Sequence, residues 1–379
     1  MGVDGHFLQL PERLGGGELW TSPGLLGYPE LSALQLLLAE QVLEEPGGSA
    51  LDLSAQSGLL AKILPRPPQL VERSKAALNA AARNGLNALA ALPWDLEGRY
   101  DLSLAILPAH LGNAAVAQVL DAAARCTAPS GRCLLAGEQR RGFSRYLEWA
   151  GERFARCEVV RRSQGLRIAR CSEPLPLGEV QVPWSYRSER GLTVCTLPGV
   201  FGQSGTDPGS ALLLSAVKGR LEGLRVLDLG SGSGILGACA AQAGAAAVLL
   251  DDDLAAVRSS QQTLIASGLT GTCLHSDICS ELPAGSRFDL ALINPPFHQG
   301  SQLSLNLGLR FLEQASCCCE EVLMVANAFL PYPKRLSELG DWSELATDGR
   351  YRVWSLRPGP RVTGSGRSSS KATGLSSCR

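Results

Sequence analysis

The feature that most constrains the fold of this chain is a sequence pattern that occurs twice. Residues 51–60 (LDLSAQSGLL) align with residues 227–236 (LDLGSGSGIL), and residues 100–104 (YDLSL) align with residues 288–292 (FDLAL). The offset between the copies grows only from 176 residues (51 to 227) to 188 residues (100 to 288). Self-similarity of this kind indicates a duplicated structural unit. A chain of 379 residues has room for two such units of ordinary size.

Each copy has the pattern of an α/β unit with a mostly parallel sheet. Short apolar runs, such as 225–229 and 288–293, alternate with helical stretches, as parallel strands joined by helices do. Two further runs, 342–347 and 351–356, are joined by a turn containing Asp348-Gly349 and predict a hairpin at an antiparallel edge. The expected fold is therefore α/β, with two tandem Rossmann-like domains.

The domain boundaries follow from changes in composition. We expect the first domain over 1–175, a proline-containing linker over 176–190, and the second domain over 191–357. Residues 358–379 are rich in Ser, Gly and Arg and are expected to form a flexible tail.

A glycine-rich turn follows the first strand of the second copy. Gly230, Gly232 and Gly234 come directly after the strand that carries Asp228. Glycines at such a turn let a cofactor lie against the backbone. Asp228-x-Gly230-x-Gly232 is typical of S-adenosylmethionine binders, whereas Gly232-x-Gly234-x-x-Gly237 also fits a dinucleotide fingerprint. The carboxylate of Asp228 favours the first template, because it suits a cationic amino-acid group and would repel a pyrophosphate.

Two acids at later strand ends are candidates for the rest of a cofactor site. Asp251 ends the second strand, where a carboxylate can accept ribose hydroxyls. Asp277 follows the third strand, where it can accept an adenine amine. Asp253 is expected to cap the next helix instead. The alternatives are a loop-bracing role for Asp228 and a solvated loop position for Asp277.

Asn294-Pro295-Pro296-Phe297 predicts a rigid bracket at the end of the fourth strand. Two prolines cannot continue a sheet ladder, and each fixes φ at about −65°. A fixed Asn294 oxygen, helped by the Pro295 carbonyl, can accept both hydrogens of an exocyclic amine. Phe297 can stack on the ring that carries the amine. The alternative is a stiff strand-to-loop turn closed by an aromatic plug.

The two copies differ where the chemistry would be. The replacements are Gly230 by Ser54, Gly232 by Gln56, and Asn294-Pro295 by Ile106-Leu107. Side chains at the glycine positions intrude on a cofactor, and an apolar side chain cannot hold an amine. We therefore expect the first copy to keep the fold and to lack the reaction. His298 has a counterpart, His110, in that copy, which favours loop packing over general-base catalysis.

Charge is concentrated in one stretch of the first copy. Between Arg125 and Arg170 there are eleven Arg, no Lys and four acidic residues, although the net charge of the chain is only −1. Helices are predicted over 28–45 and over 143–156, the second with an arginine-rich face. That face is either a solvated helix surface or an RNA-docking surface, to which Arg140-Arg141 would belong.

Cysteine and histidine usage gives no indication of a metal site. The twelve Cys contain no CxxC pair, and the chain has only four His. Free thiols are expected throughout, as in a reducing cytosol. The N-terminus, MGVDGHFLQL, lacks the pattern of a secretion signal, and no run has the composition of a membrane span. The protein is expected to be soluble and cytoplasmic.

Several of these segments together resemble a known enzyme family. They are 228–232, Asp251, Asp277, 294–300, 197–202 and 325–333. The succession looks like a class I S-adenosylmethionine-dependent methyltransferase that acts on an exocyclic amine. The last three segments resemble the bacterial ribosomal RNA guanine-N2 methyltransferases of the RsmC type. The resemblance covers most of 190–357, and it covers 1–175 only as the degenerate copy of the same fold.

The resemblance implies S-adenosylmethionine as the cofactor and a guanine N2 amine in ribosomal RNA, foremost in the small subunit, as the acceptor. It implies that 191–357 is catalytic and that 1–175 contributes RNA recognition. Phe201 and Asn327 would join Phe297 in binding the substrate. The expected partner is ribosomal RNA or the small ribosomal subunit, the expected state is a monomer, and no metal is expected.

Other functions stay open at this point. Large-subunit guanine-N2, adenine-N6 and protein glutamine-N5 methyltransferases share the same bracket. A nicotinamide dehydrogenase fits only the dinucleotide pattern Gly232-x-Gly234-x-x-Gly237. A non-enzymatic RNA-binding scaffold would require both copies to be inactive, and the intact Asn294 and glycine run argue against it.

Overall fold

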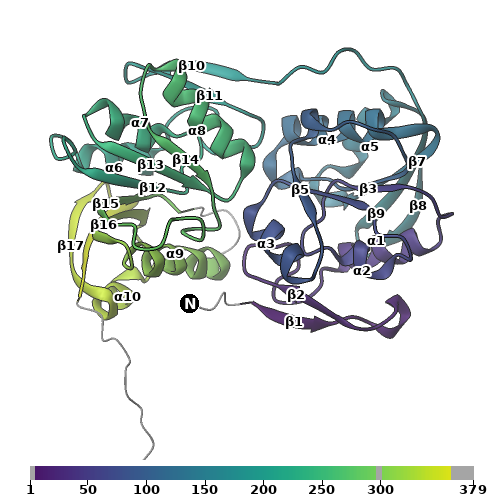
Figure 1. Ribbon diagram of the computed structural model, residues 1–379, viewed down its shortest axis with the longest axis horizontal. Coiled ribbons are helices and arrows are strands. Elements are labelled where there is room, and N and C mark those ends of the chain that lie inside the picture. Colours follow the sequence, from purple (N-terminus) through teal and green to yellow (C-terminus); the bar gives the residue numbers. More distant parts are fainter. Residues whose placement is uncertain (1–4, 296–300, 360–379) are drawn as a thin grey trace, which may run out of the picture.

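The computed structural model describes residues 5–295 and 301–359, and it contains two halves that lie side by side (Figure 1). Each half is built on a seven-stranded sheet. In spatial order the first sheet contains β5 (Ala88–Ala90), β4 (Gln69–Glu72), β3 (Ala50–Asp52), β6 (Tyr100–Ile106), β7 (Thr127–Glu138), β9 (Leu166–Pro174) and β8 (Phe154–Ser163). The second contains β14 (Thr272–His275), β13 (Ala246–Asp251), β12 (Arg225–Leu229), β15 (Phe288–Ile293), β16 (Cys319–Asn327), β18 (Tyr351–Pro358) and β17 (Gly340–Thr347).

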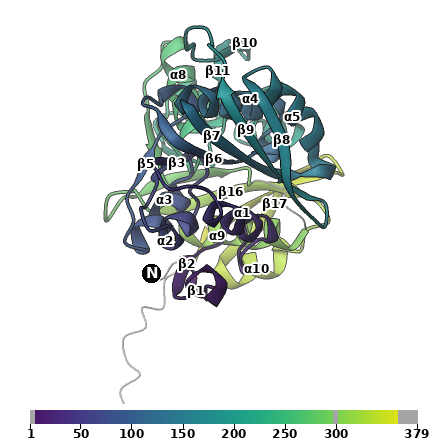
Figure 2. The same ribbon diagram turned by 90° about the vertical axis from the view of Figure 1, so that its right-hand side faces the viewer.

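The two sheets have the same topology. In each, five parallel strands are followed by an antiparallel pair. The strand third from the parallel edge is β3 in the first sheet and β12 in the second, and these are the strands that precede the aligned turns at 54–58 and 230–234. The predicted duplication and the predicted pair of Rossmann-like folds are therefore confirmed. Figure 2 shows the long antiparallel pair β8–β9 at one edge of the first sheet.

Helices cover both faces of each sheet (Figure 1). In the first half they are α1 (Ala33–Leu43), α2 (Leu59–Ile63), α3 (Lys75–Arg83), α4 (Asn113–Cys126) and α5 (Phe143–Gly151). In the second half they are α6 (Pro208–Ala216), α7 (Ile235–Gln242), α8 (Leu254–Ala266), α9 (Ser301–Ala315) and α10 (Tyr332–Leu339). Alternate strand residues serve opposite faces, as a strand requires. Val226 packs in the cluster with α7 and α8, whereas Leu227 packs in the cluster with α9 and α10.

Two helix predictions in the first half were too long. Helix α1 begins after Ser32, whose side chain accepts the Gln35 amide at 3.1 Å in a capping box, and not at residue 28. Helix α5 ends at Gly151, and Phe154 and Arg156 lie on β8 instead. Strands β8 and β9 form a local hairpin in which Ser163 pairs with Leu166, and the helical spacing of the aromatic residues between 143 and 154 concealed the start of β8.

Two further hairpins were not predicted. Strands β1 (His6–Gln9) and β2 (Glu18–Thr21) pair near the N-terminus. Strands β10 (Ser185–Glu189) and β11 (Leu192–Thr196) also pair, so β10 lies inside the stretch 176–190 that was expected to be a linker.

The two halves are joined through equivalent turns, the ones that follow β4 and β13. Ser74 and Asp253 form an isolated antiparallel bridge. The Arg73 guanidinium donates to both carboxylate oxygens of Asp253, at 2.8 and 2.6 Å. Asp252 accepts the Ser74 hydroxyl at 2.7 Å and the Ala76 amide at 2.6 Å, so a carboxylate of the second half caps the start of α3.

The cysteines depart from expectation at one place. Cys157 and Cys171, which face each other on β8 and β9, form a disulfide, so the expectation of free thiols throughout is wrong. Within the described residues, no helix is both long and apolar enough to cross a membrane. The described part of the chain also has no group of three or more His, Cys, Asp or Glu side chains placed to hold a metal ion.

Candidate active site

A cavity of about 290 Å³ lies at the carboxyl edge of the second sheet. It brings together five of the predicted site residues from four strand ends: Gly230, Gly232, Asp251, Asp277 and Asn294. Phe201 and Pro295 also line it. The carboxyl ends of parallel strands meet at one edge of a sheet, which explains why positions between 230 and 294 of the sequence converge here.

Asn294 is held in one orientation by two hydrogen bonds. Its amide nitrogen donates to the Asp207 carboxylate at 2.9 Å and to the Ser210 hydroxyl at 2.8 Å. Because a carboxylate can only accept, the nitrogen must face Asp207 and the carbonyl oxygen must face away from it. That oxygen is buried and has no hydrogen-bond partner among the described residues. A buried acceptor left without a donor is costly unless a ligand completes it.

The residues that hold Asn294 belong to the start of α6. Asp207 caps this helix by accepting the Gly209 amide at 2.9 Å, and Pro208 occupies its first position, as predicted. The link from Asp207 and Ser210 to Asn294 was not predicted. It joins residues more than 80 positions apart, and a helix cap alone gives no sign of a second partner.

Two of the three glycines predicted to bind the cofactor line the cavity. Gly230 and Gly232 have φ of 80° and 53°, in the left-handed region that favours glycine. A Cβ at Gly230 would lie 3.1 Å from the Phe311 ring. Gly234 serves another purpose, because a Cβ there would lie 2.8 Å from the Ser260 Cα atom. Gly234 therefore lets α7 pack closely on α8, and it does not line the cavity, so its predicted contact with the cofactor stays a prediction.

Asp228 lies beneath the glycine turn and not in the cavity. Its side chain is fully buried and accepts the Gly237 amide at 2.8 Å, which ties β12 to the start of α7. Burial raises the pKa of this carboxyl to about 7. The loop-bracing alternative describes this hydrogen bond, whereas the other carboxylate oxygen, Oδ1, is buried without a hydrogen-bond partner among the described residues, and the cofactor role of Asp228 stays a prediction.

The other two acids do face the cavity. Asp251 accepts the Gly232 amide at 2.8 Å and the Asp253 amide at 2.9 Å, one on each oxygen, which leaves acceptor capacity on both. Burial raises its pKa to about 6. Asp277 lies 3.9 Å from the Arg310 guanidinium, and burial raises its pKa against the lowering effect of that arginine.

The predicted substrate residues are spread more widely. Phe201 lies at the cavity and is 48% exposed, whereas Asn327 ends the neighbouring strand β16 and does not line the cavity. Pro296, Phe297 and His298 lie outside the described residues.

Arg140 and Arg141 are on the first half, in a short turn before α5, and both form ion pairs with Glu138. Most of the arginine-rich stretch is similarly paired. Seven of its eleven arginines form ion pairs with acids: 132, 140, 141, 153, 156, 161 and 170. These pairs reduce the positive surface that the sequence suggested.

Sequence reasoning missed part of the cavity wall. Pro23, Gly24 and Ala76 of the first half line the cavity, together with Arg310 and Phe311 of α9. No sequence signal could have found the first three, since they reach the cavity only because the two halves pack together.

Comparison with known proteins places these features in context. A family model described as "Methyltransferase small domain" matches residues 191–355. Ribosomal RNA small subunit methyltransferase C of Salmonella choleraesuis (strain SC-B67) is 40% identical over 188 residues, which cover 48% of this chain and 54% of that protein. The corresponding protein of Salmonella typhi is 40% identical over 190 residues, covering 48% and 55%. The match thus spans about half the length of these curated relatives.

A solved structure matches nearly the whole chain. It is the Thermus thermophilus 16S rRNA N2 G1207 methyltransferase (RsmC) in complex with AdoMet and guanosine. The identity is 34% and the TM-score is 0.84, over 93% of this chain and 98% of that one. The similarity therefore includes both halves.

Proposed function

Because this chain belongs to the RsmC family of ribosomal RNA methyltransferases, we propose that it transfers a methyl group from S-adenosylmethionine to the exocyclic N2 amine of a guanine in small-subunit (16S) ribosomal RNA. The observation that carries this proposal is the Asn294 carbonyl oxygen. It is buried at the cavity, has no partner in the described protein and cannot turn away, since Asp207 and Ser210 hold the amide nitrogen.

Asn294 and Pro295 orient the acceptor amine. The Asn294 oxygen and the Pro295 carbonyl each accept one hydrogen of the guanine N2 amine, so that the nitrogen lone pair is aimed into the cavity. S-adenosylmethionine supplies an electrophilic methyl group on a sulfonium. As the new N–C bond forms, the C–S bond would break, S-adenosylhomocysteine would leave, and the amine would lose a proton to water. The contribution of the protein is to position the amine and to stabilise the positive charge that grows on it.

The cavity fits the cofactor. Gly230 and Gly232 line the cavity without side chains, and the free acceptor positions of Asp251 suit ribose hydroxyls. We assign Asp277, which also lines the cavity, as the acceptor of the adenine amine. Asp228 supports the glycine turn from beneath.

We assign catalysis to residues 191–357 and assign RNA recognition, without catalysis, to residues 1–175. Phe201, half exposed at the cavity, is placed to contact the flipped guanine, which must leave its stack to reach the strand end. Phe297 and Asn327 keep their proposed substrate roles. In the first half, Arg140 and Arg141 share the single carboxylate of Glu138, which leaves one positive charge in excess on an exposed turn for an RNA phosphate.

We further propose that the chain acts as a monomer on ribosomal subunits in the cytoplasm. Transfer of a tritiated methyl group from S-adenosylmethionine tests the function. We expect labelling of small ribosomal subunits or 16S RNA, with the label in N2-methylguanosine. Labelling of large subunits, DNA or protein instead would favour the other methyltransferases that share the Asn-Pro-Pro-aromatic bracket.

A further inference from the structure

The first half retains a cavity at the place that corresponds to the catalytic cavity of the second half. It has a volume of about 310 Å³, against about 290 Å³ for the catalytic one. Both are lined by the ends of the same four strands of the shared topology, here β3, β4, β5 and β6. The duplicated unit therefore lost its catalytic residues without filling the space that they surrounded.

An acid equivalent to Asp251 survives in this cavity. Glu72 ends β4 as Asp251 ends β13, and only 5% of it is exposed. Its carboxylate accepts the Gln56 amide at 2.9 Å, as Asp251 accepts the Gly232 amide at 2.8 Å. The turn itself is also retained, because Gln56 has φ of 50° where Gly232 has 53°.

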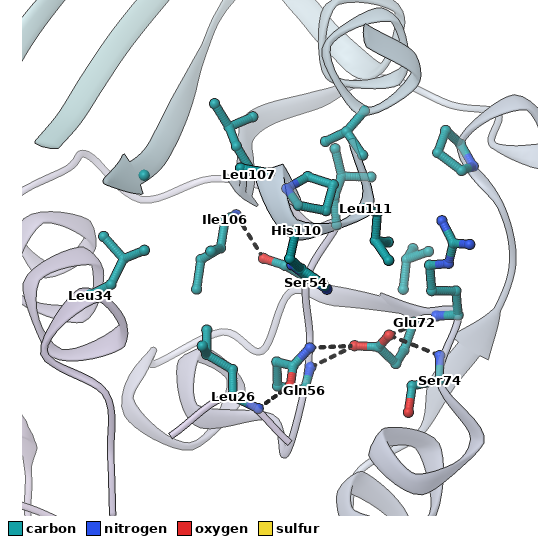
Figure 3. A pocket seen from close by; sticks show the side chains of 18 of the residues that line it. Leu26, Leu34, Ser54, Gln56, Glu72, Ser74, Ile106, Leu107, His110 and Leu111 are labelled. Carbon is teal, nitrogen blue, oxygen red and sulfur yellow. Dashed lines mark hydrogen bonds between the residues drawn. The ribbon is translucent and has the colours of Figure 1, made fainter. Parts of the chain in front are cut away.

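One acceptor position of Glu72 is weakly used. Its Oε1 atom accepts the Arg73 and Ser74 amides at 2.8 and 3.0 Å. On Oε2, the second bond comes from the Gln56 side chain at 3.4 Å, which is the longest of the group (Figure 3). A ligand hydroxyl can replace this bond, since hydrogen bonds of O–H donors to a carboxylate are short and strong.

The wall of the cavity selects against charged ligands. Four acids line it, Glu72, Glu138, Asp252 and Asp253, against two arginines, Arg73 and Arg141. Both arginines are already paired, Arg73 with Asp253 and Arg141 with Glu138. A phosphate or a carboxylate would therefore meet more acids than arginines, and the excess positive charge of the group formed by Arg140, Arg141 and Glu138 is carried by Arg140, which does not line the cavity.

The remaining wall is apolar. It includes the region that corresponds to Asn294 and Pro295 in the second half. Ile106 and Leu107 stand where Asn294 and Pro295 stand in the second half, and the Ser54 hydroxyl is occupied by the Ile106 amide at 2.9 Å. Leu26, Leu34 and Val71 supply further apolar surface. Such a wall suits the flat face of a base and gives no partner to a charged amino-acid tail.

We propose that this cavity of the first half binds an uncharged nucleoside, with a ribose hydroxyl donating to Glu72 and the base against the apolar wall. It is distinct from the cofactor cavity, although the two share Gly24, Asp252 and Asp253 in their walls. The ligand is a free nucleoside rather than a nucleotide, because each phosphate would be opposed by the acids.

Calorimetric titration of the full-length chain with adenosine tests this assignment. The chain is first saturated with S-adenosylhomocysteine, which keeps adenosine out of the cofactor site, and any binding at the amine-acceptor site of the second half is distinguished because the Leu26→Trp variant below leaves that site intact. We expect one molecule of adenosine to bind, and adenosine 5′-monophosphate to bind at least about tenfold more weakly. The absence of adenosine binding at millimolar concentrations, or binding of the monophosphate as tight as that of adenosine, would overturn the proposal.

Two variants locate the site. Glu72→Gln removes the charge on the acceptor and is expected to weaken adenosine binding about tenfold, the value of one charge-assisted hydrogen bond.

Leu26→Trp fills the mouth of the cavity from a side chain that is 40% exposed, so it abolishes binding without disturbing the core. Leu89→Trp, at an exposed residue outside the cavity wall, is the matched control and leaves binding unchanged. Unchanged adenosine binding in Leu26→Trp would place the ligand elsewhere. None of these titrations depends on methyl transfer, so their outcome is independent of the proposed reaction.

Discussion

At the scale of single residues, the proposed chemistry depends on the Asn294 oxygen. Replacing Asn294 by Ala removes the acceptor for the amine and leaves the glycine turn and Asp251 in place. We expect kcat to fall about 100- to 1,000-fold, as when a preorganised hydrogen-bonding group is removed from an active site. The affinity for S-adenosylhomocysteine, measured by calorimetry, should change little. Unchanged turnover would show that Asn294 does not hold the acceptor.

Ser210 is proposed as a positioning residue that acts through Asn294. In Ser210→Ala, Asp207 alone holds the amide, and we expect kcat to fall about tenfold while KM for RNA is unchanged. The double variant Ser210→Ala/Asn294→Ala should be no slower than Asn294→Ala alone, because both changes remove one function. Additive losses in this double-mutant cycle would contradict the coupling.

Asp228 gives a prediction about pH. Burial raises its pKa from 3.8 to about 7, so between these values the folded chain keeps a proton that the unfolded chain has released. This group therefore makes the free energy of unfolding fall as pH rises through that window. Asp228→Asn cannot titrate and should lose less stability than the wild type between roughly pH 5 and pH 8 in urea unfolding. An equal loss in both proteins would mean that Asp228 does not titrate in this window.

At the scale of elements, the glycine turn can be tested with the residue that the chain itself uses in the other half. Gln56 adopts φ of 50° at the position equivalent to Gly232, so Gly232→Gln is expected to fold. Its side chain enters the cavity, and affinity for S-adenosylhomocysteine should fall at least about tenfold. Gly178→Ala, where a Cβ meets nothing within 4 Å, is the control for a glycine replacement. If Gly232→Gln bound S-adenosylhomocysteine as tightly as the wild type does, the glycine turn would not be part of the cofactor site.

Most elements of the second half could be predicted from sequence. The strands, the glycine turn, the Asp207 and Asp253 caps and the antiparallel hairpin all follow from local signals such as buried runs and turn residues. The convergence of Asp251, Asp277 and Asn294 also followed, since strand order fixes which ends meet.

Contacts between side chains that are distant in the chain could not be predicted from the sequence. The direction of the Asp228 side chain, the hold of Asp207 and Ser210 on Asn294, and the packing role of Gly234 depend on tertiary structure. The arginine-rich stretch was misjudged for the same reason. Glu40, Glu44 and Glu45 of the α1 region pair with arginines more than 80 positions away, and charge counted within the stretch omits them.

At the scale of the whole molecule, the two halves are held together at the turns after β4 and β13. Arg73→Ala breaks a bidentate pair whose side chains are only 21% and 24% exposed, and leaves Asp253 without its partner. We expect the free energy of unfolding to fall by about 1–3 kcal/mol, and scanning calorimetry to show the two halves melting less cooperatively. The control is Arg13→Ala, which breaks a more exposed pair with Glu40 inside the first half and should cost less than about 1 kcal/mol. Equal effects of the two changes would show that the Arg73 pair does not couple the halves.

The measurement that tests the central claim most directly is nucleoside mass spectrometry of 16S RNA. Small ribosomal subunits that lack the native modification would be incubated with the purified chain and S-adenosylmethionine carrying a deuterated methyl group. We predict deuterated N2-methylguanosine with the wild type and almost none with Asn294→Ala. Deuterium in N6-methyladenosine or in protein, or equal N2-methylguanosine with both proteins, would contradict the assignment of Asn294 as the group that presents a guanine amine for methylation.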